Sequence, residues 1–93
     1  MDDRKIIRTR FSGVFFGNVT LKGKTAIVLN ARRLWYWSGA ASLSQLAVYG
    51  PSKPDRCKFP VPVSEIQLFN VIELLSVTKE AGAKIDGVKI WKE

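Results

Sequence analysis

Apolar and polar residues alternate with a period of two near the N-terminus, which is the pattern of a β-strand with one buried face. Over residues 5–11 this alternation places Arg8 and Arg10 on the same side, so we expect a half-buried strand with a basic face. Ser12 and Gly13 interrupt the pattern, and a glycine at this point is typical of a bulge or a sharp bend.

Two further apolar runs, residues 14–21 and 25–29, flank a short polar stretch centred on Gly23. They predict a β-hairpin, because β-branched and aromatic residues favour strands and glycine suits the turn. Gly17 inside the first run indicates strong coiling or a close approach of two backbones. Asn30 either ends the second run or adopts a left-handed conformation before the next element.

One helix is predicted over residues 42–49. Ser42 and Gln45 have the spacing of a capping box, in which two side chains satisfy backbone groups at the start of a helix. Gly50 suits the C-cap, and Pro51 cannot continue the helix.

The C-terminal part of the chain is less regular. All four prolines lie in residues 51–63, which predicts an extended connection or an edge strand, because proline removes a ladder donor. Residues 66–77 predict one bent strand or two short ones, although their spacing also fits a helix. One helical turn over residues 78–83, a turn at 86–87 and a last short strand over 88–91 complete the chain.

These elements add up to a mainly β (α+β) fold: a small, strongly curved antiparallel sheet or barrel with one short helix at about residues 42–49. The 93 residues form a single domain, 1–93, whose modest core would gain from homo-oligomerisation. No apolar run approaches the roughly 18–20 residues that span a bilayer, and the N-terminus lacks the apolar segment of a signal peptide. We therefore expect no membrane association.

The composition argues against catalysis. The chain contains no histidine and one cysteine, Cys57, which fits a reducing compartment. Histidine is the commonest general base and transition-metal ligand, and a lone cysteine is a poor zinc site. The carboxylates are few and scattered, and no pair of them suggests general acid–base catalysis. We therefore expect neither an enzyme nor a metal or other cofactor.

Positive charge is concentrated in the first two-thirds of the chain. The net charge is +7, and residues 1–60 contain eleven of the fifteen basic residues but only three of the eight acidic ones. Such a distribution attracts phosphates, nucleic acid or other anionic surfaces, although a basic surface can also serve solubility alone.

The strongest candidate for a binding site is the stretch RRLWYWSGAASLSQL, residues 32–46. In an extended chain, Arg33 shares one face with Trp35 and Trp37. A guanidinium binds phosphate in a bidentate manner and an indole stacks on a nucleobase, so together they suit a nucleotide-like anion. The competing interpretation is that the two tryptophans fill the core while the arginines stay in solvent.

Small residues precede the predicted helix, where exposed backbone amides favour an anion; an ordinary capped loop explains the same residues. The expected ligand-binding residues are Arg32, Arg33, Trp35, Tyr36, Trp37, Ser38 and Ser42, none of them catalytic. A secondary basic surface is expected at Arg8, Arg10, Lys53, Arg56 and Lys58.

The run NARRLWYWSGAASLSQLAVYG, followed by SKPDRCKFPVPV and an apolar stretch ending near VT, resembles a family of small uncharacterised proteins encoded by tailed bacteriophages and prophages. The resemblance extends from Phe11 to Trp91, and LWYWSGAASLSQLA is its specific part. It carries no catalytic residue set. It implies a phage gene product in the cytoplasm of the host bacterium.

Three functions remain open. The first is non-enzymatic binding of a small anionic nucleotide-like ligand, with sequestration of a host defence nucleotide signal as its consequence in a phage protein. The second is a nucleic-acid-binding module that uses the basic face and the aromatic residues. The third is a structural or assembly protein whose aromatic strip contacts another subunit. We favour the first, because the basic residues neighbour small residues and a helix N-terminus instead of forming one long run.

Overall fold

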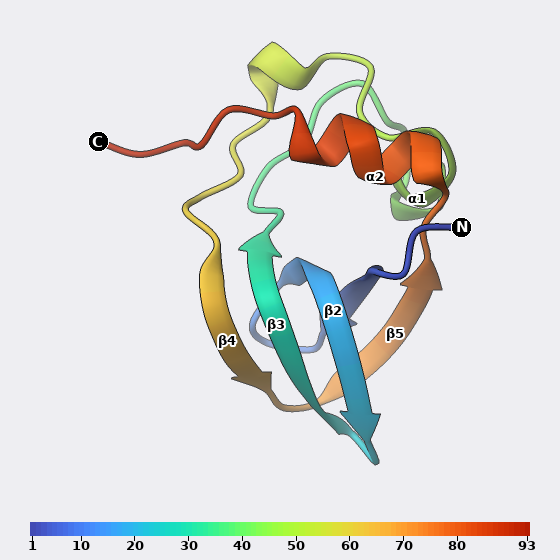
Figure 1. Ribbon diagram of the computed structural model, residues 1–93, viewed down its shortest axis with the longest axis vertical. Coiled ribbons are helices and arrows are strands. Elements are labelled where there is room, and N and C mark those ends of the chain that lie inside the picture. Colours follow the sequence, from blue (N-terminus) through green and yellow to red (C-terminus); the bar gives the residue numbers. More distant parts are fainter.

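Five antiparallel strands form one sheet in the order β4-β3-β2-β1-β5, in a computed structural model that describes all residues, 1–93. The strands are β1 (Lys5–Thr9), β2 (Val14–Lys22), β3 (Thr25–Arg33), β4 (Val63–Leu68) and β5 (Val71–Ser76). The helices are α1 (Leu43–Tyr49) and α2 (Lys79–Asp86), with a single 3-10 turn, η1 (Pro54–Arg56). Both helices cover one end of the curved sheet (Figure 1). The predicted mainly β fold is confirmed, with a second helix added and with the sheet left open instead of closed into a barrel.

The predicted hairpin is the longest pairing of the sheet. β2 and β3 pair from Lys22 and Thr25 at the turn, where Gly23 has a φ of 62°. Gly17 allows close approach of the two strands, since a Cβ built there would lie 2.7 Å from Cγ1 of Val28. Asn30 adopts a φ of 52° and shifts the register, so β3 continues past it to Arg33 instead of ending.

The stretch predicted as one bent strand or two short ones forms two strands, β4 and β5. These strands lie at opposite edges of the sheet, yet only Phe69 and Asn70 separate them in sequence. Asn70 accommodates the tight turn with a φ of 56°, and its carbonyl accepts a 2.9 Å hydrogen bond from the Arg10 amide. The Val71 amide donates a 2.9 Å bond to the carbonyl of Lys24. The two edges therefore meet at this turn, and the sheet is curled as a result (Figure 1).

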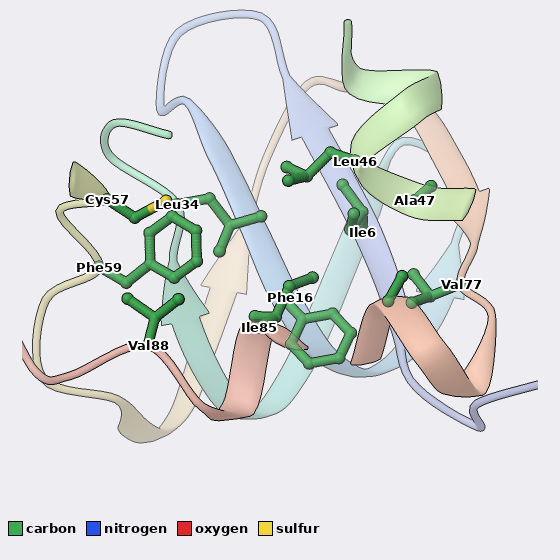
Figure 2. Packing of buried hydrophobic residues seen from close by; sticks show 11 residues of the cluster. Ile6, Phe16, Leu34, Leu46, Ala47, Cys57, Phe59, Val77, Ile85 and Val88 are labelled. Carbon is green, nitrogen blue, oxygen red and sulfur yellow. The ribbon is translucent and has the colours of Figure 1, made fainter. Parts of the chain in front are cut away.

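Apolar residues on both faces of the sheet are buried. Ile6 and Ile7 are adjacent in β1, point to opposite faces and are both fully buried, so the predicted half-buried strand is wrong at Ile6. The reason is that the helices cover the outer face at Ile6 while the curled sheet encloses Ile7. From Ile7 onwards the prediction is confirmed, because buried Ile7 and Thr9 alternate with exposed Arg8 and Arg10. The cluster under the helices contains Ile6, Phe16, Leu34, Leu46, Ala47, Cys57, Phe59, Val77, Ala81, Ile85 and Val88 (Figure 2). The cluster inside the curl contains Ile7, Phe15, Ala26, Val28, Ala31 and Leu68.

Helix α1 confirms the prediction for residues 42–49. The Ser42 hydroxyl accepts a 3.1 Å bond from the Gln45 amide, and Gly50 forms the C-cap with a φ of 75°. The Gln45 side chain accepts a bond from the Ala41 amide, one residue earlier than a standard capping box requires.

Helix α2 extends the single turn that the sequence predicted after Thr78. It continues to Asp86 because burial of Ala81 and Ile85 against the sheet stabilises a second turn. The predicted strand over residues 88–91 is wrong: the C-terminal segment makes only one isolated bridge, between Ile90 and Phe59. Neither α1 nor α2 combines the length and apolar character that crossing a membrane requires.

Candidate functional site

The segment that follows β3 divides its large side chains between the core and the surface. Leu34 is 2% exposed and packs under the helices, whereas Trp35 and Tyr36 are 58% and 49% exposed. Trp37 is partly buried against the core cluster. The choice between core and surface that the sequence left open is therefore answered residue by residue: Trp37 packs inward and Trp35 faces solvent.

Trp35 does not stand alone on the surface. Its ring stacks on that of Trp91 from the C-terminal segment, with ring centroids 5.0 Å apart and the planes inclined by 15°. The Lys58 ammonium lies 5.6 Å from the centroid of each indole ring and 6.0 Å from that of Tyr36. We call these four residues, Trp35, Tyr36, Lys58 and Trp91, the aromatic platform.

Backbone hydrogen bonds hold the three chain segments of the aromatic platform side by side. Tyr36 and Lys58 exchange two bonds, of 3.2 and 2.8 Å, and the Trp91 amide donates a 3.0 Å bond to the Phe59 carbonyl. Phe59 itself is fully buried in the core cluster under the helices. The platform is therefore anchored to the core through its backbone, while its rings are left at the surface.

Arg32 is buried, with 8% of its surface exposed, and its side chain bonds the protein's own backbone. Its guanidinium donates bonds of 3.0 Å to the Ile85 carbonyl and 2.7 Å to the Val88 carbonyl, and a longer one of 3.4 Å to Phe59. Burial lowers the pKa of Arg32, and the charge of Asp86 opposes this effect. Arg32 thus ties the end of α2 and the C-terminal segment to β3, and its donors are largely occupied.

Arg33 is half-buried and contacts a different part of the molecule from the one that Arg32 contacts. Its guanidinium stacks over the Phe15 ring at 4.3 Å and donates a 2.6 Å bond to the Ser12 carbonyl in the β1–β2 loop. No carboxylate pairs with it.

The two serines have local roles. The Ser42 hydroxyl caps α1, and the Ser38 amide donates a 3.4 Å bond to the Cys57 sulfur. Three surface hollows have volumes of about 320, 440 and 300 Å³, and Arg32 is the only predicted ligand residue that lines any of them. The seven predicted ligand residues are therefore not gathered around one enclosing pocket.

The predicted secondary basic surface is also divided. Arg8 forms an ion pair of 2.9 Å with Glu73, whereas the Arg10 guanidinium lies 5.3 Å from the ring of its neighbour Phe11. Lys53 and Arg56 are exposed at η1. Lys58 belongs to the aromatic platform.

Sequence reasoning missed Trp91 and an N-terminal ion-pair network. Arg4 bonds both Asp2, at 2.8 Å, and Asp86 at the end of α2, at 2.6 Å. The hydrogen bond from the Arg4 side chain lowers the pKa of Asp2 to about 2, from an ordinary value of 3.8. The sequence around Trp91 reads KIWKE, so this tryptophan is flanked by charged residues. Such a position is unusual for a core residue and could have indicated that Trp91 is exposed.

One comparison with known proteins gives a match. A family model described as a domain of unknown function (DUF6948) matches residues 3–85, which is most of the chain and all five strands. No curated protein and no solved structure shows a significant match.

Proposed function

The chain belongs to the DUF6948 family of domains of unknown function, and from this premise we propose that it is a single-stranded nucleic-acid-binding module. The observation that carries the proposal is the pair Trp35 and Trp91, stacked at 5.0 Å yet exposed by 58% and 44%. Single-stranded nucleic acid is bound by aromatic rings on which bases stack, next to cations that meet the phosphates.

The aromatic platform has the chemistry for both contacts. Each indole covers one face of the other, so a base can stack on an outer face, a contact worth about 1–3 kcal/mol per base. The Lys58 ammonium lies beside both indoles and forms no ion pair, so its charge is free to meet a phosphate. The two indoles are already stacked on each other and their backbone is anchored, so less conformational freedom is lost on binding.

An extended ligand fits the surface better than an enclosed one. None of the three hollows is lined by Trp35, Tyr36 or Trp91, whereas a strand with splayed bases needs only an open surface. The net charge of +7 adds long-range attraction for a polyanion.

A small anionic nucleotide is the second candidate. The same observation favours it, since one base on Trp35 would place its phosphate within reach of Lys58. Sequestration of a host defence signal needs a more enclosed site, which pairing of two copies in a homo-oligomer would supply. The phage origin, the bacterial cytoplasm and the homo-oligomer stay predictions.

The test is a titration of the wild-type protein with oligothymidylate, a mononucleotide and a matched duplex, monitored by tryptophan fluorescence and anisotropy. We expect quenching and binding by the single strand, weaker binding by the duplex, and an affinity that falls steeply with salt. Trp35→Ala should weaken single-strand binding about tenfold or more, because one base loses its stacking partner.

Tyr49→Ala is the matched control, since Tyr49 is 59% exposed but lies on α1, on the side of the molecule away from the C-terminal segment (Figure 1). It should bind like the wild type. Equal losses in the two variants, or no binding by the wild type, would show that the platform is not the binding surface. Saturable binding of the mononucleotide alone would assign the small-ligand function instead.

A further inference from the structure

The β1–β2 loop presents a second exposed aromatic ring beside a cation. Phe11 is 76% exposed, and the Arg10 guanidinium lies 5.3 Å from its ring centroid. Neither residue contributes to the two core clusters, and Arg10 forms no ion pair. The Phe11 ring gains little from burial within the chain, so most of its surface is available for a contact with a ligand.

This loop is held in one shape. The buried Thr9 bonds the Gly13 carbonyl through its amide, at 2.9 Å, and through its hydroxyl, at 3.0 Å. The same hydroxyl accepts a 2.9 Å bond from the Ser12 amide, and Gly13 closes the turn with a φ of 94°. The Arg10 amide is fixed to the β4–β5 turn by a 2.9 Å bond to Asn70. Phe11 is thus displayed on a rigid loop, which is the preorganisation that a contact residue needs.

Arg33 connects this loop to the aromatic platform. It bonds the Ser12 carbonyl at 2.6 Å and precedes Trp35 by two residues, which is about 7 Å along an extended chain. The Leu34 amide adds a 2.8 Å bond to Val14, so the end of β3 and the loop lie side by side. Arg33 is therefore bonded to the loop that carries Arg10 and Phe11 and lies two residues before the stacked Trp35.

We propose that Arg10 and Phe11 form a second subsite for the same single strand that the aromatic platform binds. A base stacks on Phe11, Arg10 meets its phosphate, and Arg33 lies between the two subsites. This inference rests on the proposed function and adds a footprint to it: a dinucleotide occupies the platform alone, and a longer strand reaches the loop.

A length series tests the footprint. Fluorescence anisotropy would give the dissociation constants of oligothymidylates of two, four, six and eight nucleotides for the wild type and for Phe11→Ala, Trp35→Ala and Tyr49→Ala. We expect Phe11→Ala to match the wild type for the dinucleotide and to bind the longest strands about tenfold or more weakly. Trp35→Ala should weaken binding at every length, and Tyr49→Ala at none. Phe11 is exposed, so its variant should keep the wild-type melting temperature.

The outcomes separate the two proposals. If Phe11→Ala matches the wild type at every length while Trp35→Ala does not, the second subsite is wrong and the platform function stands. A loss for Phe11→Ala that is equal at all lengths, the dinucleotide included, also overturns the footprint. Absence of binding at every length overturns both proposals.

A salt titration gives an independent reading. Arg10→Ala should make the slope of log K against log salt shallower by about 0.7 for an eight-nucleotide strand, because one phosphate contact is lost, and should leave the dinucleotide slope unchanged. Lys84→Ala, an exposed charge on α2, is the control and should change neither slope. Equal changes for the two variants would assign only diffuse electrostatic attraction to Arg10.

Discussion

Replacing Arg32 with methionine should both destabilise the protein and loosen the aromatic platform. The substitution keeps much of the side-chain volume but removes the donors that bond the carbonyls of Ile85, Val88 and Phe59. Val88 belongs to the segment that carries Trp91, so the loss frees that segment from β3 on one side.

The magnitude follows from the two good hydrogen bonds, of 3.0 and 2.7 Å, because the third is long at 3.4 Å. A hydrogen bond from a charged group contributes about 1.5–3 kcal/mol. Relief of the burial cost of the cation offsets part of this sum, in keeping with the lowered pKa of Arg32 and its unpartnered Nε atom. We expect a net loss of about 2–4 kcal/mol, a large fraction of the stability of a domain this small.

The assay is chemical denaturation followed by tryptophan fluorescence, combined with near-UV circular dichroism of the native state to monitor the stacked indoles. Arg33→Met is the matched control. Arg33 is half-buried, donates one exposed hydrogen bond to the Ser12 carbonyl and stacks over the Phe15 ring, so its replacement should cost about 1–2 kcal/mol, less than that of Arg32, and leave the indole signal unchanged. Equal stabilities of the two variants would refute the reasoning. So would an Arg32→Met protein that is destabilised but keeps the wild-type indole signal.

Three further outcomes are expected from the other contacts. Gly82→Ala should destabilise the wild type by about 1 kcal/mol although alanine favours helices, because a Cβ at this position overlaps Oδ2 of Asp2. In an Asp2→Ala background the same substitution should stabilise the protein by up to about 1 kcal/mol. An equal effect in both backgrounds, measured by chemical denaturation, would contradict this explanation. The pKa of Asp2 is about 2 against an ordinary 3.8, so its pairing with Arg4 stabilises the fold fully above pH 3.8 and this contribution is lost as the pH falls through about 2. The difference in unfolding free energy between the wild type and Asp2→Asn should therefore be about 1 kcal/mol at pH 6, after allowance for solvent screening, and close to zero at pH 2. A difference that does not change with pH would exclude the pairing. Gly17→Ala should lower the free energy of unfolding by about 2 kcal/mol or more, since the new Cβ would lie 2.7 Å from Val28 Cγ1. A melting temperature within about 2 °C of the wild-type value would contradict this.

Local patterns predicted most of the secondary structure. The apolar runs over residues 14–21 and 25–29 and the glycine between them specify the hairpin without reference to the rest of the chain. The cap at Ser42 was equally accessible, since it depends on residues three apart. The left-handed conformation of Asn30 was one of two alternatives that its residue type allowed.

Long-range contacts account for what the sequence did not predict. The sequence predicts a ligand at Arg32, but its partners are the carbonyls of Ile85 in α2 and Val88 just after it, 53 and 56 positions away, and no local pattern indicates them. Burial of Ile6 likewise depends on where the helices pack, and burial of Ile7 on the curl of the sheet. Trp35 is exposed, but the cation beside it is Lys58, which lies 23 positions further along the chain, and not Arg32 or Arg33. Its stacking partner, Trp91, lies in a segment for which the sequence predicts a strand.

The pairing of β1 with β5 sets the order in which the chain can complete its fold during synthesis. Lys5 and Ser76 are partners in the β1–β5 register and their side chains share a 3.1 Å hydrogen bond, but they lie 71 positions apart in the sequence. β1 must therefore wait, with one edge unpaired, until β5 has left the ribosome. Pairings this distant in sequence are slow to form, on a scale of about milliseconds to seconds, and an unpaired strand edge invites association with other chains meanwhile. Efficient folding of this small protein thus depends on its last third, and a chain that is released before residue 71 lacks the strand that would protect β1.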